Sequence, residues 1–253
     1  MREMEAMIKM AELGEVFTGT EAREALNMKK GAFYYHIRRL ERDGIIERIG
    51  RNRYRLGLHS QGASDSFVLA SVMVPESAVG YWSALNYYGM TEQIPRLTYV
   101  LTTIRRNYRN LESRGIKAVI IRKKKFFGFR VLRIAGRTVR ITDPEKTVAD
   151  CLDRPRNCGG IIEVAKALRL GVDVETVAEN LRKMGSNAGL KRLGYLGEIL
   201  GFEISGLNEE INEMKGYSLL DPTLGRKGRW NGKWRLIVNI PEGYLEEESE
   251  YDR

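Results

Sequence analysis

The side chains of Asp143, Glu145 and Lys146 are of the kinds that a metal-dependent nuclease uses. Two carboxylates can bind Mg²⁺, and together with a lysine they can position an attacking water. Such a site normally takes its carboxylates from different strands, whereas these three residues lie within four consecutive positions. Their order is typical of a helix start, with Asp143 as the N-cap, Pro144 in the first helical position and Glu145 in the first turn. We therefore predict a helix cap here and no catalytic site.

Other patterns that carry enzymatic chemistry are missing from the sequence. It contains no Gly-rich phosphate loop that ends in Lys and Ser or Thr, no Gly-x-Gly-x-x-Gly and no Gly-x-Ser-x-Gly. The two cysteines, Cys151 and Cys158, are too few for a disulfide framework, and we expect them to be reduced thiols. With only His36 and His59 beside them, a structural zinc site is not expected. We expect a protein that is not an enzyme and uses no metal or cofactor.

Positive charge is concentrated in one stretch of the chain. The formal net charge is +9, but residues 96–140 alone carry 14 lysines and arginines and one acidic residue. The segment before this stretch, residues 57–95, has no basic residue. Nucleic acid is the most economical partner for such a concentration of charge. The alternative is a basic face that contacts only solvent.

A helix is predicted from about Lys30 to Asp43, and its two faces differ. At 100° per residue, Phe33, Ile37 and Leu40 form one apolar stripe. The opposite face carries side chains that can bond phosphates and base edges: Tyr34, Tyr35, Arg38 and Arg42. Two lysines, Lys29 and Lys30, stand at the helix start and oppose its dipole. Their placement favours a helix whose N-terminus meets phosphates.

The elements around this helix complete a compact module. Residues 1–13 are predicted to be a helix, and a second helix over 16–26 has Thr18 or Thr20 as its N-cap. After the third helix comes a short hairpin, whose turn residues Arg51, Asn52 and Arg53 are further candidates for phosphate contacts. This order predicts a winged helix-turn-helix DNA-binding domain over residues 1–60. A winged helix that binds a protein is the alternative.

A Gly- and Ser-rich linker at 57–66 leads to a larger mixed α/β domain over residues 61–245. Its β-rich part, about 95–142, has predicted strands at 97–103, 117–122, 129–134 and 138–142. Its helical part, about 143–203, has predicted helices from Asp143 to about Leu152 and at 161–168, 174–184 and 190–200. We also predict a helix from Pro75 to Tyr88, a strand at 234–240 and an acidic tail at 246–253. The expected fold class is α+β.

The β-rich part holds a predicted second basic surface, made of Arg105, Arg106, Arg109, Arg122, Lys123, Lys124 and Lys125. Phe126, Phe127 and Phe129 follow the last of these residues. Alternating basic and aromatic side chains can clamp a phosphate backbone or stack on bases. The three phenylalanines are more often part of a core, because they have no polar group to satisfy at the surface.

Three short motifs follow the winged helix in a fixed order. They are Ser83-Ala84-Leu85 with Gly89 four residues later, Asp143-Pro144-Glu145-Lys146-Thr147 with Asp150, and Arg192-Leu193-Gly194. In this order and at these spacings, over roughly residues 1–240, the chain resembles the AbiEi family, antitoxins of type IV toxin–antitoxin systems. The motif residues are expected to be structural.

The resemblance implies a transcriptional repressor that binds inverted repeats of double-stranded DNA upstream of its own operon. It also implies that the larger domain is an antitoxin domain. This domain would counteract a cognate nucleotidyltransferase-like toxin of the AbiEii type, without requiring a stable complex, and such pairs often act in phage defence.

Two other functions stay open on the sequence alone. One is a nucleic-acid enzyme, nuclease-like, that holds its substrate on the basic surface of residues 96–140. The other is an RNA-binding module that uses the same surface without catalysis. No apolar run approaches the roughly 18 residues of a transmembrane helix, and the N-terminus lacks a secretory signal. We therefore expect a cytoplasmic protein without a membrane partner.

Overall fold

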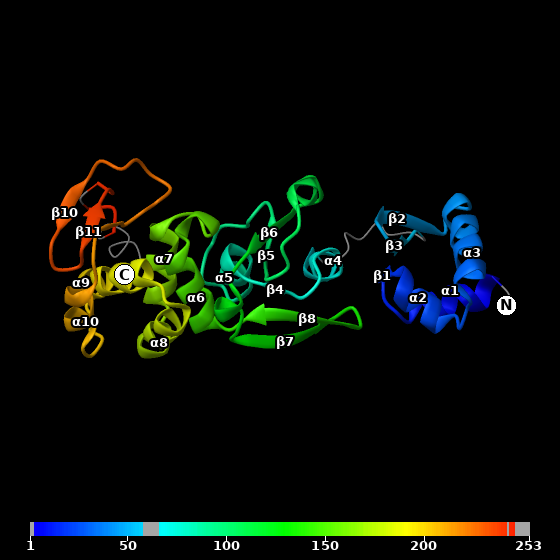
Figure 1. Cartoon of the computed structure of the whole chain (residues 1–253), viewed down its shortest axis with the longest axis horizontal. Coiled ribbons are helices and arrows are strands. Elements are labelled where there is room, and N and C mark those ends of the chain that lie inside the picture. Colours follow the sequence, from blue (N-terminus) through cyan, green and yellow to red (C-terminus); the bar gives the residue numbers. More distant parts are fainter. Residues whose placement is uncertain (1–2, 58–65, 242, 246–253) are drawn as a thin grey trace.

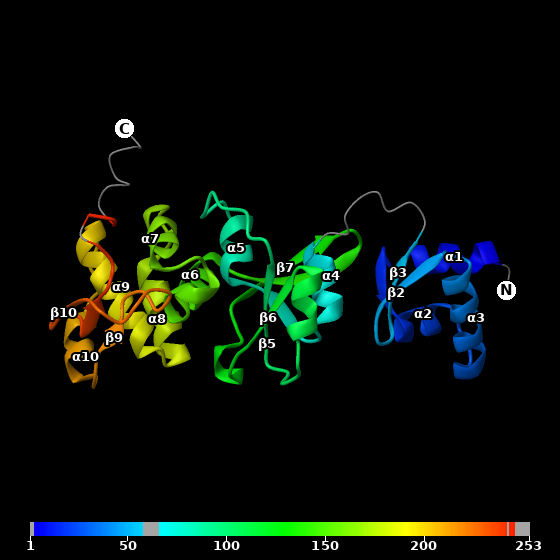
Figure 2. The same cartoon turned by 90° about the horizontal axis from the view of Figure 1, so that it is seen from above.

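The computed structural model describes residues 3–57, 66–241 and 243–245, and it has the mixed α+β architecture expected from the sequence. Its elements follow one another along the long axis of the molecule, from α3 at one end to a small C-terminal sheet at the other (Figures 1 and 2). The predicted tail at 246–253 and most of the predicted linker lie outside the described residues.

The N-terminal module contains three helices and one three-stranded antiparallel sheet. Its elements are α1 (Glu3–Ala11), β1 (Val16–Thr18), α2 (Gly19–Ala25), α3 (Lys30–Arg42), β2 (Ile46–Gly50) and β3 (Arg53–Leu56), and the strand order is β1-β3-β2. Residues 16–18 form a strand, so the predicted helix over 16–26 begins three residues late. Thr18 is its N-cap in a capping box, in which the Thr18 hydroxyl and the Glu21 carboxylate each accept the other residue's backbone N–H.

The core of this module confirms the predicted apolar stripe of the third helix. Phe33, Ile37 and Leu40 are buried and share one cluster with Phe17 and Tyr54 from the sheet. The helix ends before Gly44, which has a φ of 70°. This left-handed conformation favours glycine and turns the chain into β2.

A five-stranded mixed sheet forms the middle of the molecule, with the order β6-β5-β4-β8-β7. The four predicted strands are present as β5 (Thr98–Thr102), β6 (Ile116–Ile120), β7 (Phe129–Ile134) and β8 (Arg137–Thr142). The turn between β7 and β8 has positive φ at both Ala135 and Gly136, as a tight two-residue hairpin turn requires. Three short 3₁₀ helices accompany these elements: η1 (Arg109–Arg114), η2 (Lys123–Lys125) and η3 (Pro155–Asn157).

The predicted helix from Pro75 to Tyr88 is wrong in its first half. The chain forms α4 (Ser66–Met73), a turn at Pro75, the central strand β4 (Ser77–Val79) and then α5 (Tyr81–Tyr87). A strand of three residues is too short to show a period in the sequence, and its place in the sheet depends on its partners β5 and β8. Gly80 ends this strand against Leu101, where an added Cβ would lie 2.1 Å from a Leu101 methyl carbon.

The helical part contains the four predicted helices and one more. These are α6 (Pro144–Asp153), α7 (Ile161–Arg169), α8 (Val174–Met184), α9 (Asn187–Leu200) and the additional α10 (Leu207–Glu213). The chain then forms a small sheet of β9 (Ser218–Leu219), β10 (Arg229–Asn231) and β11 (Leu236–Val238), in the order β10-β11-β9. Only β11 was expected. Within 3–57, 66–241 and 243–245, no helix has the length and apolar character needed to cross a membrane.

The N-terminal module is docked on the larger part of the chain by polar and apolar contacts. The Arg53 guanidinium donates to the carbonyl of Val72 at 2.7 Å. Arg137, at the start of β8, donates to the carbonyl of Leu13 at 2.9 Å and to the Glu21 carboxylate at 2.8 Å. Val16 and Ile49 join the apolar cluster that α4 forms with the central sheet. These contacts place the module against both α4 and the β7–β8 hairpin.

Candidate nucleic-acid interface

The outer face of α3 is exposed, as its sequence predicts. Tyr35 is 77% exposed and Tyr34 is 43% exposed, and Arg38 lies exposed one turn further along the helix. The Tyr34 ring packs edge-on against Phe33, with 5.7 Å between ring centroids. This contact anchors the ring on the core and leaves its hydroxyl at the surface. Among the described residues, no carboxylate pairs with Arg38.

The start of α3 is suited to phosphate. Lys29 is the N-cap residue, its side chain has no acceptor atom for a capping hydrogen bond, and the first turn contains no acidic residue. The first backbone N–H groups of the helix are therefore uncapped by a side chain, with Lys29 and Lys30 exposed beside them. A helix N-terminus of this kind favours an anion through its N–H groups and its dipole. At the other end, Arg42 lies 3.8 Å from the Asp43 carboxylate in an exposed pair of little energetic weight.

The turn between β2 and β3, which we call the wing, carries three of the predicted phosphate contacts, and the structure gives two of them partners within the protein. Arg51 is exposed. Asn52 holds the turn on α2, since its carbonyl accepts the N–H of Gly19 at 2.9 Å and its amide donates to the Thr20 hydroxyl at 3.2 Å. Arg53 is turned toward α4 by its bond to the Val72 carbonyl. Asn52 and Arg53 therefore fix the wing, and Arg51 is left for an external contact.

The segment after β5 brings further positive charge to the wing. Burial lowers the pKa of Arg53, and the nearby positive charge of Arg106 lowers it further, which places Arg106 close to the wing. Tyr108 and Leu111 pack on the same apolar cluster as Ile49 of β2. Arg105 and Arg106 are both exposed. We call Arg51, Arg105 and Arg106 the wing cluster.

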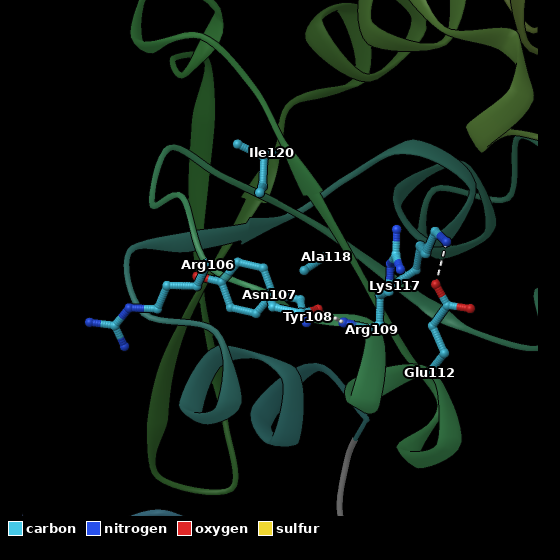
Figure 3. A pocket seen from close by; sticks show the side chains of 8 residues that line it. All are labelled: Arg106, Asn107, Tyr108, Arg109, Glu112, Lys117, Ala118 and Ile120. Atoms are coloured by element: carbon cyan, nitrogen blue, oxygen red, sulfur yellow. Dashed lines mark hydrogen bonds and ion pairs between the residues drawn. The ribbon is translucent and has the colours of Figure 1, made fainter.

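A depression of about 570 Å³ lies beside the wing cluster, lined by Arg106, Tyr108, Arg109 and neighbouring residues of β6 (Figure 3). Lys117 and Glu112 form an ion pair within it. In Figure 3 the Arg106 side chain extends away from this pair, whereas Arg109 lies beside it. Arg106 is therefore the better placed of the two for an external partner.

The remaining cations of the predicted second basic surface lie around η2. Lys125 was wrongly included in that surface. Its side chain is 13% exposed, and its ammonium lies 2.6 and 2.8 Å from the two Asp153 carboxylate oxygens. Asp153 also accepts from the Ser186 hydroxyl at the N-cap of α9, so Lys125 joins η2 to two helices. Three exposed residues remain, which we call the η2 cluster: Arg122, Lys123 and Lys124.

The three phenylalanines after η2 pack against the protein's own interior, as expected for side chains without a polar group. Phe126 and Phe127 are partly buried and pack on the main core, and Phe129 packs against Phe126 with 4.6 Å between ring centroids. The Lys183 ammonium lies 3.9 Å from the Phe127 ring centroid. These rings are thus held by the protein itself.

The nuclease-like residues form a helix start and a buried ion pair. The Asp143 carboxylate accepts the Lys146 N–H at 2.7 Å, and Pro144 occupies the first turn, which confirms the predicted cap. The Lys146 side chain is fully buried, with its ammonium 2.5 Å from the Asp150 carboxylate. Burial raises the pKa of Asp150 to about 6, although the Lys146 charge opposes this rise.

Lys146 therefore points into the core, away from any substrate. Among the described residues, no three His, Cys, Asp or Glu side chains gather so that they could hold a metal ion. Cys151 and Cys158 are both buried free thiols, and burial raises the pKa of each. Lys146 and the two cysteines are therefore part of the interior of the protein.

Sequence reasoning missed the docking roles of Arg53 and Arg137. Arg137 contacts residues that precede it by more than one hundred positions, and no local pattern reports such a contact. Proximity of Arg106 to the wing was missed for the same reason. A basic residue in a turn gives the same local sequence pattern whether it contacts a ligand or another part of its own chain.

Comparison with known proteins gives a likeness of fold. No protein-family model matches the sequence, and no curated protein matches it. The chain is similar to the crystal structure of the RV2827C protein from Mycobacterium tuberculosis, with a TM-score of 0.68 and 14% sequence identity. The similarity covers 97% of this chain and 94% of that chain, so the whole arrangement of elements is shared.

Proposed function

We propose that this chain is a DNA-binding transcriptional repressor whose N-terminal module is a winged helix-turn-helix. The observation that carries the proposal is the outer face of α3, where Tyr34, Tyr35 and Arg38 are exposed opposite a fully buried apolar stripe. An α-helix of this kind fits the major groove, where an arginine can bond guanine and tyrosine hydroxyls can bond phosphates.

The surroundings of α3 support a duplex as the partner. The lysines at its uncapped N-terminus can bond one phosphate backbone, and Arg51 at the wing tip can bond another. Arg106 adds charge next to the wing. Because Arg53 and Arg137 tie the module to the rest of the chain, α3 and these flanking cations keep one arrangement when they meet DNA.

We further propose that the repressor acts on its own operon and is the antitoxin of a nucleotidyltransferase-like toxin in the cytoplasm. This part rests on the resemblance to AbiEi antitoxins, and the contacts of the motif residues are consistent with a structural role for them. The Ser83 hydroxyl accepts the Tyr99 N–H and so joins α5 to β5. Arg192 is buried and donates to the carbonyls of Leu152, Leu219 and Leu220, which joins α6 to the C-terminal sheet.

The test of DNA binding is a footprint on the duplex just upstream of the gene for this protein. We expect protection of inverted repeats by the native chain. Arg38→Ala should weaken specific binding by about 1–3 kcal/mol if Arg38 bonds a base, and Tyr34→Ala should weaken it as well. Arg182→Ala, which removes an arginine of α8 at a distance from α3, is the matched control. Unchanged operator binding by the Arg38→Ala, Tyr34→Ala double variant would rule out α3 as the recognition helix.

The antitoxin role is tested separately by co-expression with a neighbouring nucleotidyltransferase gene. Growth should be rescued by the native protein, and rescue should persist in the α3 double variant when both genes are expressed from foreign promoters. Failure of rescue would refute the antitoxin role and leave operator binding untouched. Metal-dependent cleavage of plasmid or RNA by the purified protein would instead favour the nuclease alternative.

A further inference from the structure

The small C-terminal sheet presents an exposed tryptophan. The Trp230 side chain on β10 is 65% exposed, whereas Trp234, four residues later, is buried. The Trp230 ring packs at 68° against Tyr217, with 4.6 Å between ring centroids, and Tyr217 is itself 43% exposed. Large aromatic side chains with this much free surface are typical of contact sites.

The strand register places both rings on the outer face of the sheet. Trp230 pairs with Ile237, and Ile237 pairs with Leu219, so these three side chains share one face. Tyr217 precedes Leu219 by two residues and points the same way. The adjacent Leu236 is fully buried and points to the opposite face, toward the helices. The outer face therefore carries two aromatic rings side by side.

Basic residues flank the two aromatic residues in the sequence. Residues 222–241 contain five basic residues and no acidic one. Lys233 pairs with Glu198, and Arg235 donates to the Asn212 carbonyl, so these two are engaged within the protein. Arg226 and Lys227 are exposed in the segment that leads into β10, and Lys215 is exposed just before Tyr217.

We propose that this face, the Trp230 surface, binds single-stranded RNA. It is made of Trp230, Tyr217, Lys215, Arg226 and Lys227. Bases stack on the two rings, and the cations neutralise the adjoining phosphates. A duplex keeps its bases stacked on one another, so rings on an open sheet select unpaired bases, which RNA loops and ends present. Ile237 and Leu219 share this face, but the exposed cations next to Tyr217 and Trp230 in the sequence favour an anionic partner.

The Trp230 surface lies at the end of the molecule opposite α3 (Figures 1 and 2). Operator DNA and RNA would therefore occupy separate places on the chain. The inference is independent of the proposed repressor function, because it rests on other residues and another form of nucleic acid.

The experiment titrates the full-length protein with a fluorescein-labelled, unstructured RNA of 12 nucleotides, about one stacking-platform site. Trp230→Ala should weaken RNA binding by about five-fold or more. Trp230→Phe keeps an aromatic ring and should recover most of the affinity. Replacing Lys215, Arg226 and Lys227 by glutamine should flatten the salt slope by about 2, at about 0.7 per phosphate contact. Tyr87→Ala removes an exposed ring of α5 that belongs to neither proposed surface and should leave RNA binding unchanged.

Equal RNA affinity of the native protein and the Trp230→Ala variant, with the fold verified by circular dichroism, overturns the proposal. Tighter binding of a DNA oligonucleotide of the same sequence assigns the surface to single-stranded DNA instead. Loss of growth rescue against the toxin in Trp230→Ala, without any effect on RNA, assigns it to a protein. Operator binding separates this proposal from the repressor function, because Trp230→Ala should retain it and Arg38→Ala should lose it.

Discussion

The wing cluster and the η2 cluster should differ in how they affect the binding of operator DNA. One variant replaces Arg51, Arg105 and Arg106 by glutamine, and the other replaces Arg122, Lys123 and Lys124 by glutamine. Each variant loses three positive charges, so both formal net charges fall from +9 to +6. Arg51 belongs to the N-terminal module, Arg106 is close to Arg53 of the wing, and Arg105 adjoins Arg106 in the sequence. The η2 cluster lies beside Lys125 and its partner on α6.

The magnitude follows from counterion release. Each lost phosphate contact lowers the salt slope of the logarithm of the binding constant by about 0.9 for duplex DNA. The loss of three contacts therefore lowers the slope by about 2.7. Between roughly 50 and 200 mM salt, the wing variant should then lose about 40-fold less affinity than the native protein. Fluorescence anisotropy of a labelled operator duplex over this salt range measures both slopes. We expect the native slope for the η2 variant.

Two results would refute this reasoning. An equal change of slope in both variants would show that net charge, and not position, governs binding. An unchanged slope in the wing variant would show that none of Arg51, Arg105 and Arg106 reaches phosphate. The second result would remove the wing from the candidate interface.

Three further predictions concern residues that have bonding partners within the protein. Arg53→Gln should lower the free energy of unfolding by about 1.5–3 kcal/mol, because it loses the bond to the Val72 carbonyl. The salt slope of DNA binding should stay unchanged, and a flattened slope would show that Arg53 contacts phosphate. Asp150→Asn should destabilise the protein by about 3–5 kcal/mol in urea unfolding, because Lys146 stays buried without its counter-charge; a near-native midpoint would contradict this. Burial alone would raise the pKa of Glu21, but hydrogen bonds from Thr18 and Arg137 hold this pKa below its usual 4.5. The stabilisation by Glu21 is therefore full above about pH 4.5 and is lost as the pH falls through the lowered pKa, so Glu21→Gln should reduce the acid dependence of stability in that window.

Local sequence patterns were sufficient for the elements with a strong period or cap. The stripe of Phe33, Ile37 and Leu40 recurs at helical spacing, so the buried face of α3 follows from the sequence alone. Asp143 before Pro144 marks the start of α6 because both residues act within one turn of the helix. Patterns of this kind failed for β4, where three residues are too few to show a period and only the neighbouring strands decide the conformation.

The sequence by itself determined which side chains α3 exposes, and therefore which residues are candidates for the DNA contact. It also located the positive charge in residues 96–140, but it did not determine how that charge is used. Only the tertiary structure turned Arg53 toward α4, buried Lys125 against Asp153 and brought Arg106 to the wing. It likewise placed Tyr217 and Trp230 on one face of a sheet. The physical reason is that helical periodicity and capping act over a few residues, whereas a cation's role depends on partners that chain folding brings from distant positions.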